Sequence, residues 1–286
     1  MTNKLNSLAD IEEMVAAALR EDVADGDVTA SLIDPLLKCH AHVVCREQAI
    51  LCGQAWFNET FKQCDPECDV RWTVADGDHM SPDQTVCEIH GNARAMVTAE
   101  RTALNFLQTL SGTASTTHRF IGQTRGTKCK LLDTRKTVPL FRNAQKYAVA
   151  CGGGVNHRIG LYDGILIKEN HIEAAGSITN AIEQMRQNRP GMEIEIEVED
   201  LEQLQEALNA TAEILLLDNF SLSDTRKAVE ITAGRAVLEA SGGFDFDDIA
   251  AVAQTGVDFI SIGALTKHVR ATDFSMRFDS SFRSAP

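Results

Sequence analysis

The chain has 286 residues, of which 44% are hydrophobic and 24% charged, a composition typical of a globular protein with a sizeable core. Its formal net charge of -14 argues against a surface that coats nucleic acid, because such a domain is basic overall. No apolar run is long enough to cross a bilayer, and the first residues lack the apolar stretch of a signal peptide. With eight scattered cysteines, which fit reduced thiols, this predicts a cytoplasmic protein without a membrane partner.

Positive charge is concentrated in one segment of this acidic chain. Residues 125–168 contain nine Lys or Arg and two Asp, a net charge of +7. Such a segment favours a focused pocket for a small polyanion. The alternative is a solvated basic helix face, and we prefer that alternative for Lys128, Lys130 and Lys146.

The N-terminal part reads as a mixture of helices and short strands. Apolar residues at helical spacing behind Ser7, a suitable N-cap, predict a first helix. Alternating stretches then predict strands within 41–53, 70–78 and 84–91, with a helix over 55–64 and a long helix from about Thr98. We expect an α+β sandwich domain over residues 1–107, joined by the C-terminal tail 270–286.

From residue 130 onward the pattern changes to a regular alternation of strands and helices. Successive strands in the second half of this region begin about 20 to 23 residues apart, as in repeated βα units. This regularity predicts a parallel sheet with helices outside it, in the form of an incomplete α/β barrel of about six strands over residues 108–269. The expected strands lie within 130–135, 164–170, 193–200, 213–219, 236–243 and 258–264.

The carboxyl ends of barrel strands form the usual active site, so the residues found there carry the functional prediction. The first two strands end in cations, the middle two in carboxylates, and the last two in small residues with accessible backbone N–H groups. Guanidinium groups bind carboxylates, glycine-rich turns bind phosphate, and paired acids bind sugar hydroxyls or Mg²⁺. We therefore expect an organic acid, a phosphate, and a sugar diol or a metal as ligands. The residues are Thr134, Arg135, Lys136, Lys168, Glu197, Asp218, Ser241, Gly242, Gly243, Ile262, Gly263 and Ala264, with His157 and Arg158 from a connecting loop.

Two of these features have a simpler interpretation. Gly152, Gly153 and Gly154 can merely end the preceding helix, since glycine is favoured there. In the segment 193–199 the glutamates share one face, which would be solvated on an open sheet but points inward in a barrel. Inward carboxylates need partners, and Lys168 and Lys136 are the ones we expect.

The chain resembles the quinolinate phosphoribosyltransferase family. The resemblance runs in order through ERTALNFLQTLSG, DTRKTVPLFRNAQKYAV, GGGVNHRIGLYDGILIKENH, EVED, LLDNF, EASGG and ISIGALT, over nearly the whole chain. It implies transfer of a phosphoribosyl group from 5-phosphoribosyl 1-pyrophosphate to quinolinate. The products are nicotinate mononucleotide, pyrophosphate and CO₂, in NAD biosynthesis. It also implies an α/β sandwich followed by an incomplete barrel, a homodimer, and Mg²⁺ as cofactor.

The resemblance also implies roles for individual residues. The quinolinate pocket is lined by Arg135, His157, Arg158 and Lys168 and completed by Arg101 of the partner subunit, Lys136 lies between the two substrates, and Thr134 binds substrate. Glu197 and Asp218 face the ribose and its metal, and with Lys136 they are the catalytic residues. Residues 241–243 and 262–264 hold the 5-phosphate.

Three other functions remain open. A sister phosphoribosyltransferase would take nicotinate itself. A Schiff-base aldolase would use Lys168, which ends a strand amid apolar residues, but would leave the arginines and paired acids without a role. A regulatory module would bind phosphoribosyl pyrophosphate without turnover.

Overall fold

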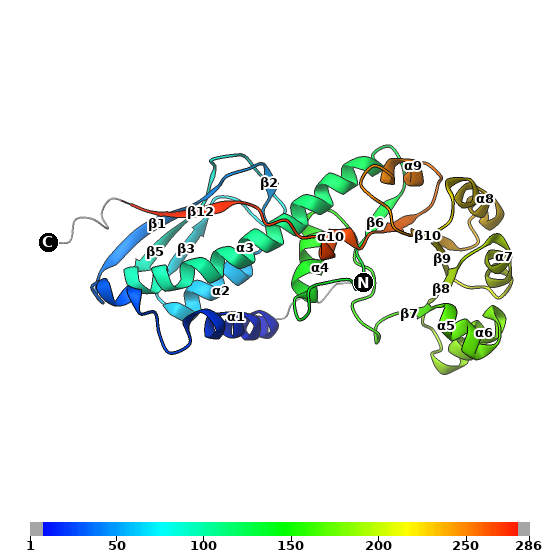
Figure 1. Ribbon diagram of the computed structural model, residues 1–286, viewed down its shortest axis with the longest axis horizontal. Coiled ribbons are helices and arrows are strands. Elements are labelled where there is room, and N and C mark those ends of the chain that lie inside the picture. The colour runs from blue at the N-terminus through cyan, green and yellow to red at the C-terminus, as the bar shows by residue number, and fades with distance from the viewer. Residues whose placement is uncertain (1–7, 280–286) are drawn as a thin grey trace. The chain divides into compact units, whose positions relative to one another are not determined.

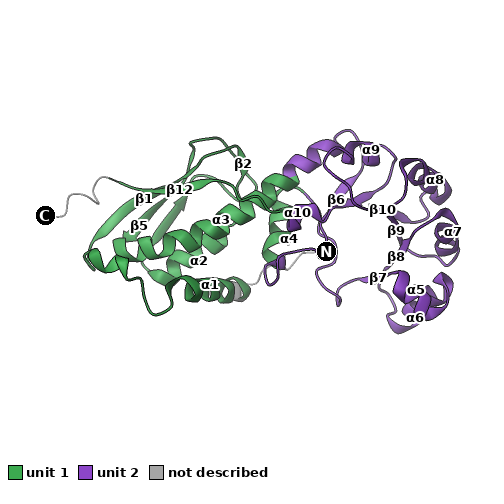
Figure 2. Cartoon of the chain, viewed as in Figure 1, with its two compact units in different colours: residues 1–117, 143–153, 268–286 green, residues 118–142, 154–267 purple. Residues whose placement is uncertain are grey.

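The computed structural model describes residues 8–279, so the helix cap expected at Ser7 lies outside the described residues. The chain divides into two compact units (Figure 2), residues 1–117, 143–153 and 268–286 in unit 1 and residues 118–142 and 154–267 in unit 2. The first division falls after residue 117, within the long helix α3 (Ala93–Ile121), and all of α4 (Arg142–Cys151) except its first residue belongs to unit 1. Within the described part, no helix has the length and apolar character that a membrane span requires.

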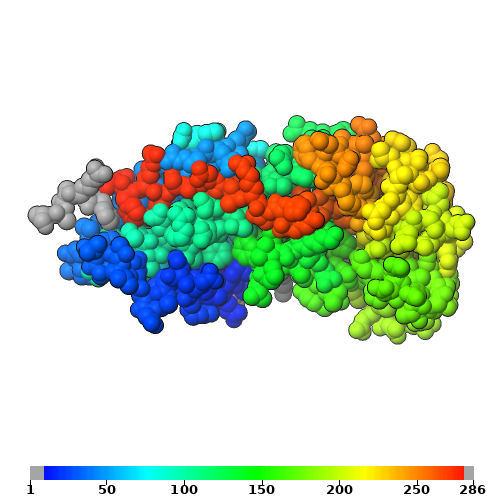
Figure 3. Space-filling model, in the orientation of Figure 1, coloured from blue at the N-terminus to red at the C-terminus, as the bar shows by residue number. Residues whose placement is uncertain are grey.

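Unit 1 is built around an antiparallel sheet with the strand order β12-β1-β5-β3 (Figure 1). Among the described residues, the last strand pairs with the first, which brings residues 274–278 into this sheet as an edge strand at the surface (Figure 3). Two short strands, β2 and β4, form a separate pair. The elements are α1 (Leu8–Val23), η1 (Thr29–Leu32), β1 (Lys38–Cys45), β2 (Ala49–Ile50), α2 (Gln54–Cys64), β3 (Asp69–Trp72), β4 (His79–Met80), β5 (Thr85–Asn92) and β12 (Phe274–Phe278).

The core of unit 1 lies between this sheet and helices α2 and α3. Phe57 and Phe61 of α2 and Met96 and Leu107 of α3 are almost fully buried against the apolar face of β1 and β5. Burying one such side chain stabilises the fold by about 1.5–3 kcal/mol. The helices therefore hold the sheet through one continuous apolar layer.

Unit 2 is a six-stranded parallel sheet in the order β6-β11-β10-β9-β8-β7, with helices on its outside (Figure 1). Because β6 and β7 are the two edge strands, the barrel is incomplete, which confirms the predicted fold class. The strands are β6 (Lys130–Leu132), β7 (Ile165–Ile167), β8 (Ile194–Val198), β9 (Ile214–Asp218), β10 (Val237–Ser241) and β11 (Phe259–Ser261). The helical segments are η2 (Gly122–Thr124), α5 (Glu169–Ala175), α6 (Ile178–Asn188), α7 (Leu201–Asn209), α8 (Leu222–Thr232), α9 (Ile249–Ala253) and α10 (Ala264–Lys267).

Strand β8 shows how the sequence directs side chains to the two faces of this sheet. Ile194, Ile196 and Val198 are fully buried, on the face that packs against helices α6 and α7. Because strand residues alternate between faces, Glu195 and Glu197 point to the opposite, inner face, as the sequence predicts. Helices α7 and α8, which follow β8 and β9, begin at the side-chain caps Asp200 and Ser221.

Two expectations from the sequence concern helix α4 and the glycines that follow it. Lys146 is completely buried, so its assignment to a solvated face is wrong. Gly153 has a φ of +92°, which suits the left-handed end of a helix. Gly152 is required for a second reason, since a Cβ atom there would lie 2.7 Å from Cβ of Thr117 on α3. These glycines end the helix and let its last turn approach α3.

Candidate active site

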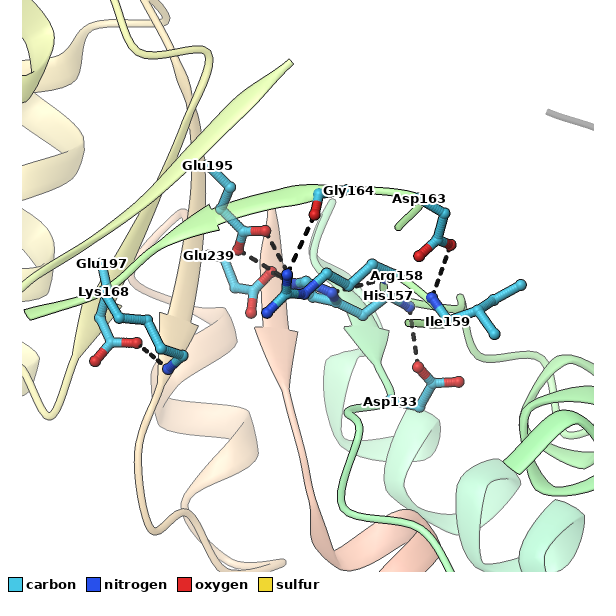
Figure 4. Close-up of polar contacts among 10 residues, drawn as sticks. All are labelled: Asp133, His157, Arg158, Ile159, Asp163, Gly164, Lys168, Glu195, Glu197 and Glu239. Carbon is cyan, nitrogen blue, oxygen red and sulfur yellow. Dashed lines mark hydrogen bonds and ion pairs between the residues drawn. The ribbon is translucent and has the colours of Figure 1, made fainter. Parts of the chain in front are cut away.

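The loop that carries His157 and Arg158 is fixed to the end of strand β6. The carboxylate of the buried Asp133 accepts hydrogen bonds from the backbone N–H of His157 (3.0 Å) and from the side chain of Asn156 (2.6 Å). One residue earlier, Val155 forms a parallel bridge with Leu132. Asp133 therefore positions this loop at the mouth of the barrel (Figure 4).

His157 points at two inward-facing glutamates, one on strand β8 and one on strand β10 (Figure 4). Its Nε2 lies 3.0 Å from Glu195 on β8 and 3.6 Å from Glu239 on β10. Its Nδ1 accepts the backbone N–H of Arg158 at 2.7 Å, so the single ring proton of this tautomer sits on Nε2 and is donated to Glu195. The three side chains could ligate a metal, but a protonated Nε2 favours a hydrogen-bonded cluster instead.

Glu239 is the most perturbed carboxyl group of this cluster. Burial, followed by the nearby Glu195, raises the pKa of Glu239 to about 7. One of its oxygen atoms is buried and has no hydrogen-bond partner within residues 8–279. Near neutral pH, the cluster thus binds a proton that an exposed glutamate would already have lost.

Two arginines approach each other at the barrel mouth. Burial, followed by the charge of Arg135, lowers the pKa of Arg158, whose guanidinium also donates to the carbonyl of Gly164 at 3.2 Å. Arg142 links their two loops by donating to the carbonyls of Arg135 (3.3 Å) and Ile159 (3.0 Å). Two cations held together in this way form a receptor for an anion, and a carboxylate matches the guanidinium geometry.

A second polar cluster lies at the ends of β7, β8 and β9. Lys168 forms an ion pair with Glu197, so this expected partnership is present. Burial, followed by the charge of Glu197, raises the pKa of Asp218, while Lys168 and Lys136 act in the opposite direction. Two carboxylates that repel each other at adjacent strand ends fit a divalent cation with a preference for oxygen ligands.

The turns after β10 and β11 contain the small residues that the sequence singles out. A Cβ atom on Gly263 would lie 2.9 Å from Cδ of Lys136, so glycine allows the lysine to cross this turn. Gly242 packs beside the side chain of Asn219, and the position of a Cβ atom on Gly243 is open. The backbone N–H of Ile262 already donates to Leu132 at 2.9 Å, which leaves Gly263 and Ala264 to offer N–H groups to a ligand.

All the site residues that the sequence predicts between Thr134 and Ala264 belong to unit 2, whereas Arg101 belongs to unit 1. Arg101 is exposed on α3, where its charge lowers the pKa of Glu100 against the larger effect of burial. Sequence reasoning missed four residues of this site, although the alternation in 193–199 already indicated an inward Glu195. The missed residues are Asp133, Arg142, Glu195 and Glu239.

An incomplete α/β barrel whose strand ends carry clustered cations and paired acids defines an enzyme class that acts on small polyanionic substrates. Residues 113–277 match the family model "Quinolinate phosphoribosyl transferase, C-terminal domain" and residues 27–111 match the model of its N-terminal domain.

Individual relatives agree with the family models. "Probable nicotinate-nucleotide pyrophosphorylase [carboxylating]" of Bacillus subtilis is 40% identical over 257 residues, 90% of this chain and 89% of its own. "Quinolinate phosphoribosyltransferase [decarboxylating] 2b, mitochondrial" of Nicotiana tabacum is 36% identical over 292 residues, 95% of this chain and 83% of its own. The solved nicotinate-nucleotide pyrophosphorylase of Francisella tularensis is 44% identical and superimposes with a TM-score of 0.93, covering 98% of this chain and all of the other. The chain belongs to the quinolinate phosphoribosyl transferase family, the phosphoribosyltransferases of de novo NAD biosynthesis.

Proposed function

We propose that this chain joins quinolinate to 5-phosphoribosyl 1-pyrophosphate, releasing pyrophosphate and CO₂ and forming nicotinate mononucleotide. The observation that carries the proposal is that the loops of Arg135 and Arg158, which Arg142 joins, accompany Glu197 and Asp218 at the carboxyl ends of the adjacent strands β8 and β9. The first pair suits a substrate with two carboxylates. The second pair suits a ribose that becomes positively charged.

Quinolinate binds to the cationic end of the site. Arg135 and Arg158 hold one carboxylate, and binding relieves the repulsion that lowers the pKa of Arg158. His157 lines the pocket in a position that Glu195 and Asp133 fix, and Lys168 and Thr134 complete the pocket. Arg101 of the partner subunit adds a further cation in the proposed homodimer.

The phosphoribosyl donor binds across the remaining strand ends. Gly242, Gly243, Gly263 and Ala264 offer backbone N–H groups to its 5-phosphate, together with Ser241. Glu197 and Asp218 face the ribose and would hold Mg²⁺, which would screen their mutual repulsion. When bound, Mg²⁺ supplies positive charge that stabilises the departing pyrophosphate.

The reaction needs positioning and charge rather than a covalent enzyme intermediate. The ring nitrogen of quinolinate bonds to C1 of the ribose as the bond to pyrophosphate breaks, and the carboxylates of Glu197 and Asp218 stabilise the positive sugar between them. Lys136, placed beside Asp218, stabilises the charge that develops on the leaving group. The alkylated ring then accepts the electron pair left at C2 when CO₂ departs, and a proton takes its place.

Two wider properties belong to the same proposal. The eight cysteines are all free, which supports a reducing compartment such as the cytoplasm. Leu140, Leu161 and Tyr162, on the loops that carry the cations, are 97%, 73% and 79% exposed, and a dimer would cover such apolar side chains.

Product analysis with carboxyl-labelled quinolinate tests the function. We expect labelled CO₂ to be released in the same molar amount as unlabelled pyrophosphate, and the release of both to depend on Mg²⁺. We expect no turnover of nicotinate. Turnover of nicotinate without quinolinate turnover would identify the sister reaction. Binding of the donor without any product would indicate a regulatory module, and trapping of Lys168 by borohydride with a carbonyl substrate would indicate an aldolase.

A further inference from the structure

Two cysteines of unit 1, far apart in sequence, meet outside the proposed active site. The thiol sulfurs of Cys52 and Cys151 and a carboxylate oxygen of Asp76 all lie within 4.8 Å of one another. Cys52 is fully buried, whereas Cys151 at the end of α4 is only partly buried. The proposed reaction uses neither thiol.

Both cysteines lie in segments that contact helix α3. Cys52 receives a hydrogen bond from the Ser111 hydroxyl on its carbonyl (3.1 Å) and donates its N–H to the same hydroxyl (3.0 Å). Cys151 precedes Gly152, which packs against Ala114 and Thr117 so closely that no side chain fits there. The proximity of the two sulfurs is therefore a property of the packed unit and does not depend on a mobile loop.

Polar groups around the pair distinguish the two thiols. The Tyr147 hydroxyl, one turn before Cys151 on α4, donates to Asp76 at 2.9 Å. A hydrogen bond from Cys52 lowers the pKa of Cys151 against the opposing effects of burial and of Asp76, whereas burial raises the pKa of Cys52 well above its ordinary value. One partly exposed thiol, Cys151, thus lies beside one buried thiol, Cys52, an arrangement suited to stepwise oxidation that begins at Cys151.

The same cluster is a poor metal site. The Asp76 carboxylate already accepts the backbone N–H groups of Gly53 (3.0 Å) and Gln54 (3.3 Å) on one oxygen and the Tyr147 hydroxyl on the other. Metal binding requires both thiols to be deprotonated, which burial disfavours for Cys52. The hydrogen-bonded carboxylate is better explained as a support for the turn that faces the two thiols.

We propose that Cys52 and Cys151 form an intrachain disulfide when the protein meets hydrogen peroxide. Cys151 loses its thiol proton and its sulfur attacks one peroxide oxygen; the O–O bond breaks, giving a Cys151 sulfenic acid and a hydroxide, which takes up the released proton to become water. The Cys52 sulfur then attacks the Cys151 sulfur, and the hydroxyl group leaves with the Cys52 proton as a second water. Two thiols and one peroxide become one disulfide and two waters, so each sulfur loses one electron and the peroxide gains two.

Peptide mapping of the full-length protein after peroxide treatment tests the proposal without any substitution. We expect the alkylatable thiols to fall from eight to six and a cross-linked peptide pair containing Cys52 and Cys151, both reversed by dithiothreitol. A first cross-link between other cysteines, or alkylation of both residues unchanged after treatment, would overturn the proposal. Protection of the two thiols by copurified zinc, removed by a chelator, would do so as well.

Variants separate the attacking cysteine from the resolving one. Cys52→Ser should accumulate a sulfenic acid at Cys151 that dimedone captures, and Cys151→Ser should give neither the adduct nor the cross-link. Cys129→Ser is the matched control, because Cys129 is a buried thiol of unit 2 whose pKa burial raises to about 12. A cross-link that persists in Cys151→Ser, or dimedone capture at Cys52 in place of Cys151, would contradict the assigned roles.

Discussion

The surroundings of Arg158 disfavour the charged form of its guanidinium group when no anion is bound. Burial and the neighbouring Arg135 both lower its pKa. Truncating one partner of a desolvated ion pair costs about 2–5 kcal/mol of binding free energy. We expect Arg158→Ala to weaken quinolinate binding by that amount and to change binding of the phosphoribosyl donor much less, as measured by calorimetry with each substrate separately.

The control for Arg158→Ala removes the same charge elsewhere in unit 2. Arg186 on the outer helix α6 is exposed and pairs with Glu213 at 3.0 Å, so Arg186→Ala should leave both affinities unchanged. Equal losses for both substrates in Arg158→Ala would show that the quinolinate pocket is assigned to the wrong residues.

Glu239 should make the protein less stable as the pH rises toward neutrality. Its pKa is about 7 in the folded protein against an ordinary value of 4.5, so the folded state binds more protons between these two pH values. The free energy of unfolding therefore falls as pH rises through this window, by up to about 3 kcal/mol, and the effect is absent below about pH 4.5. Glu239→Gln should flatten the decrease, as measured by urea unfolding at pH 5 and pH 7.5. A decrease of the same size in the variant would mean that Glu239 is not the group responsible.

At the residue scale, sequence reasoning succeeded where side-chain direction follows from the strand alternation. It predicted that Glu195 and Glu197 point inward, and Lys168 does pair with Glu197. It did not predict that His157, from a loop with no regular period, is the partner of Glu195. The burial of Lys146 was also missed, because a single charged residue carries no local signal of the packing around it.

At the scale of elements, the strands could be predicted because the βα units repeat along the chain. The conformations of the loops could not be predicted. The six strands of unit 2 fall within the segments expected from apolar periodicity. The two cation-bearing loops are instead joined by Arg142, which also binds the Thr137 hydroxyl at 3.1 Å. Such tertiary hydrogen bonds leave no pattern in a single sequence.

Arg142 supplies a test of whether these loops act together. As a positioning residue, it should affect quinolinate affinity without altering the chemistry, since its hydrogen bonds end on the loops. Losing charged hydrogen bonds worth about 1.5–3 kcal/mol predicts a rise in the quinolinate KM of about 10- to 100-fold for Arg142→Ala, with a smaller change in kcat. Arg142→Lys should recover only part of the loss, because one ammonium group cannot span three acceptors. A fall in kcat at constant KM would place Arg142 in the chemical step instead.

At the scale of the whole molecule, the segment that supplies most of the site's cations has a charge opposite to that of the rest of the chain. The net charge of -14 is interrupted by the basic segment 125–168, which contributes Arg135, Arg158 and Lys168 to the proposed site. Other cations of the segment lie elsewhere, since Lys146 is buried in unit 1 and Lys128 pairs with Asp258 before β6 begins. Arg101 remains outside that segment, exposed on α3 of unit 1. A simple exposed ion pair with Glu100 would be worth less than about 1 kcal/mol, whereas the proposed homodimer gives Arg101 a role in the partner's quinolinate pocket.

Subunit exchange distinguishes these two roles of Arg101. Arg101→Ala and Lys136→Ala should each be inactive alone. In a mixed dimer, one site combines the intact Lys136 of one chain with the intact Arg101 of the other, while the second site carries both defects. Random exchange of equal amounts makes about half of the dimers mixed, each with one complete site, so about a quarter of the unsubstituted activity should return. If Arg101 served its own chain, every site in a mixed dimer would retain one defect, and activity would stay absent even when mass spectrometry confirms the exchange.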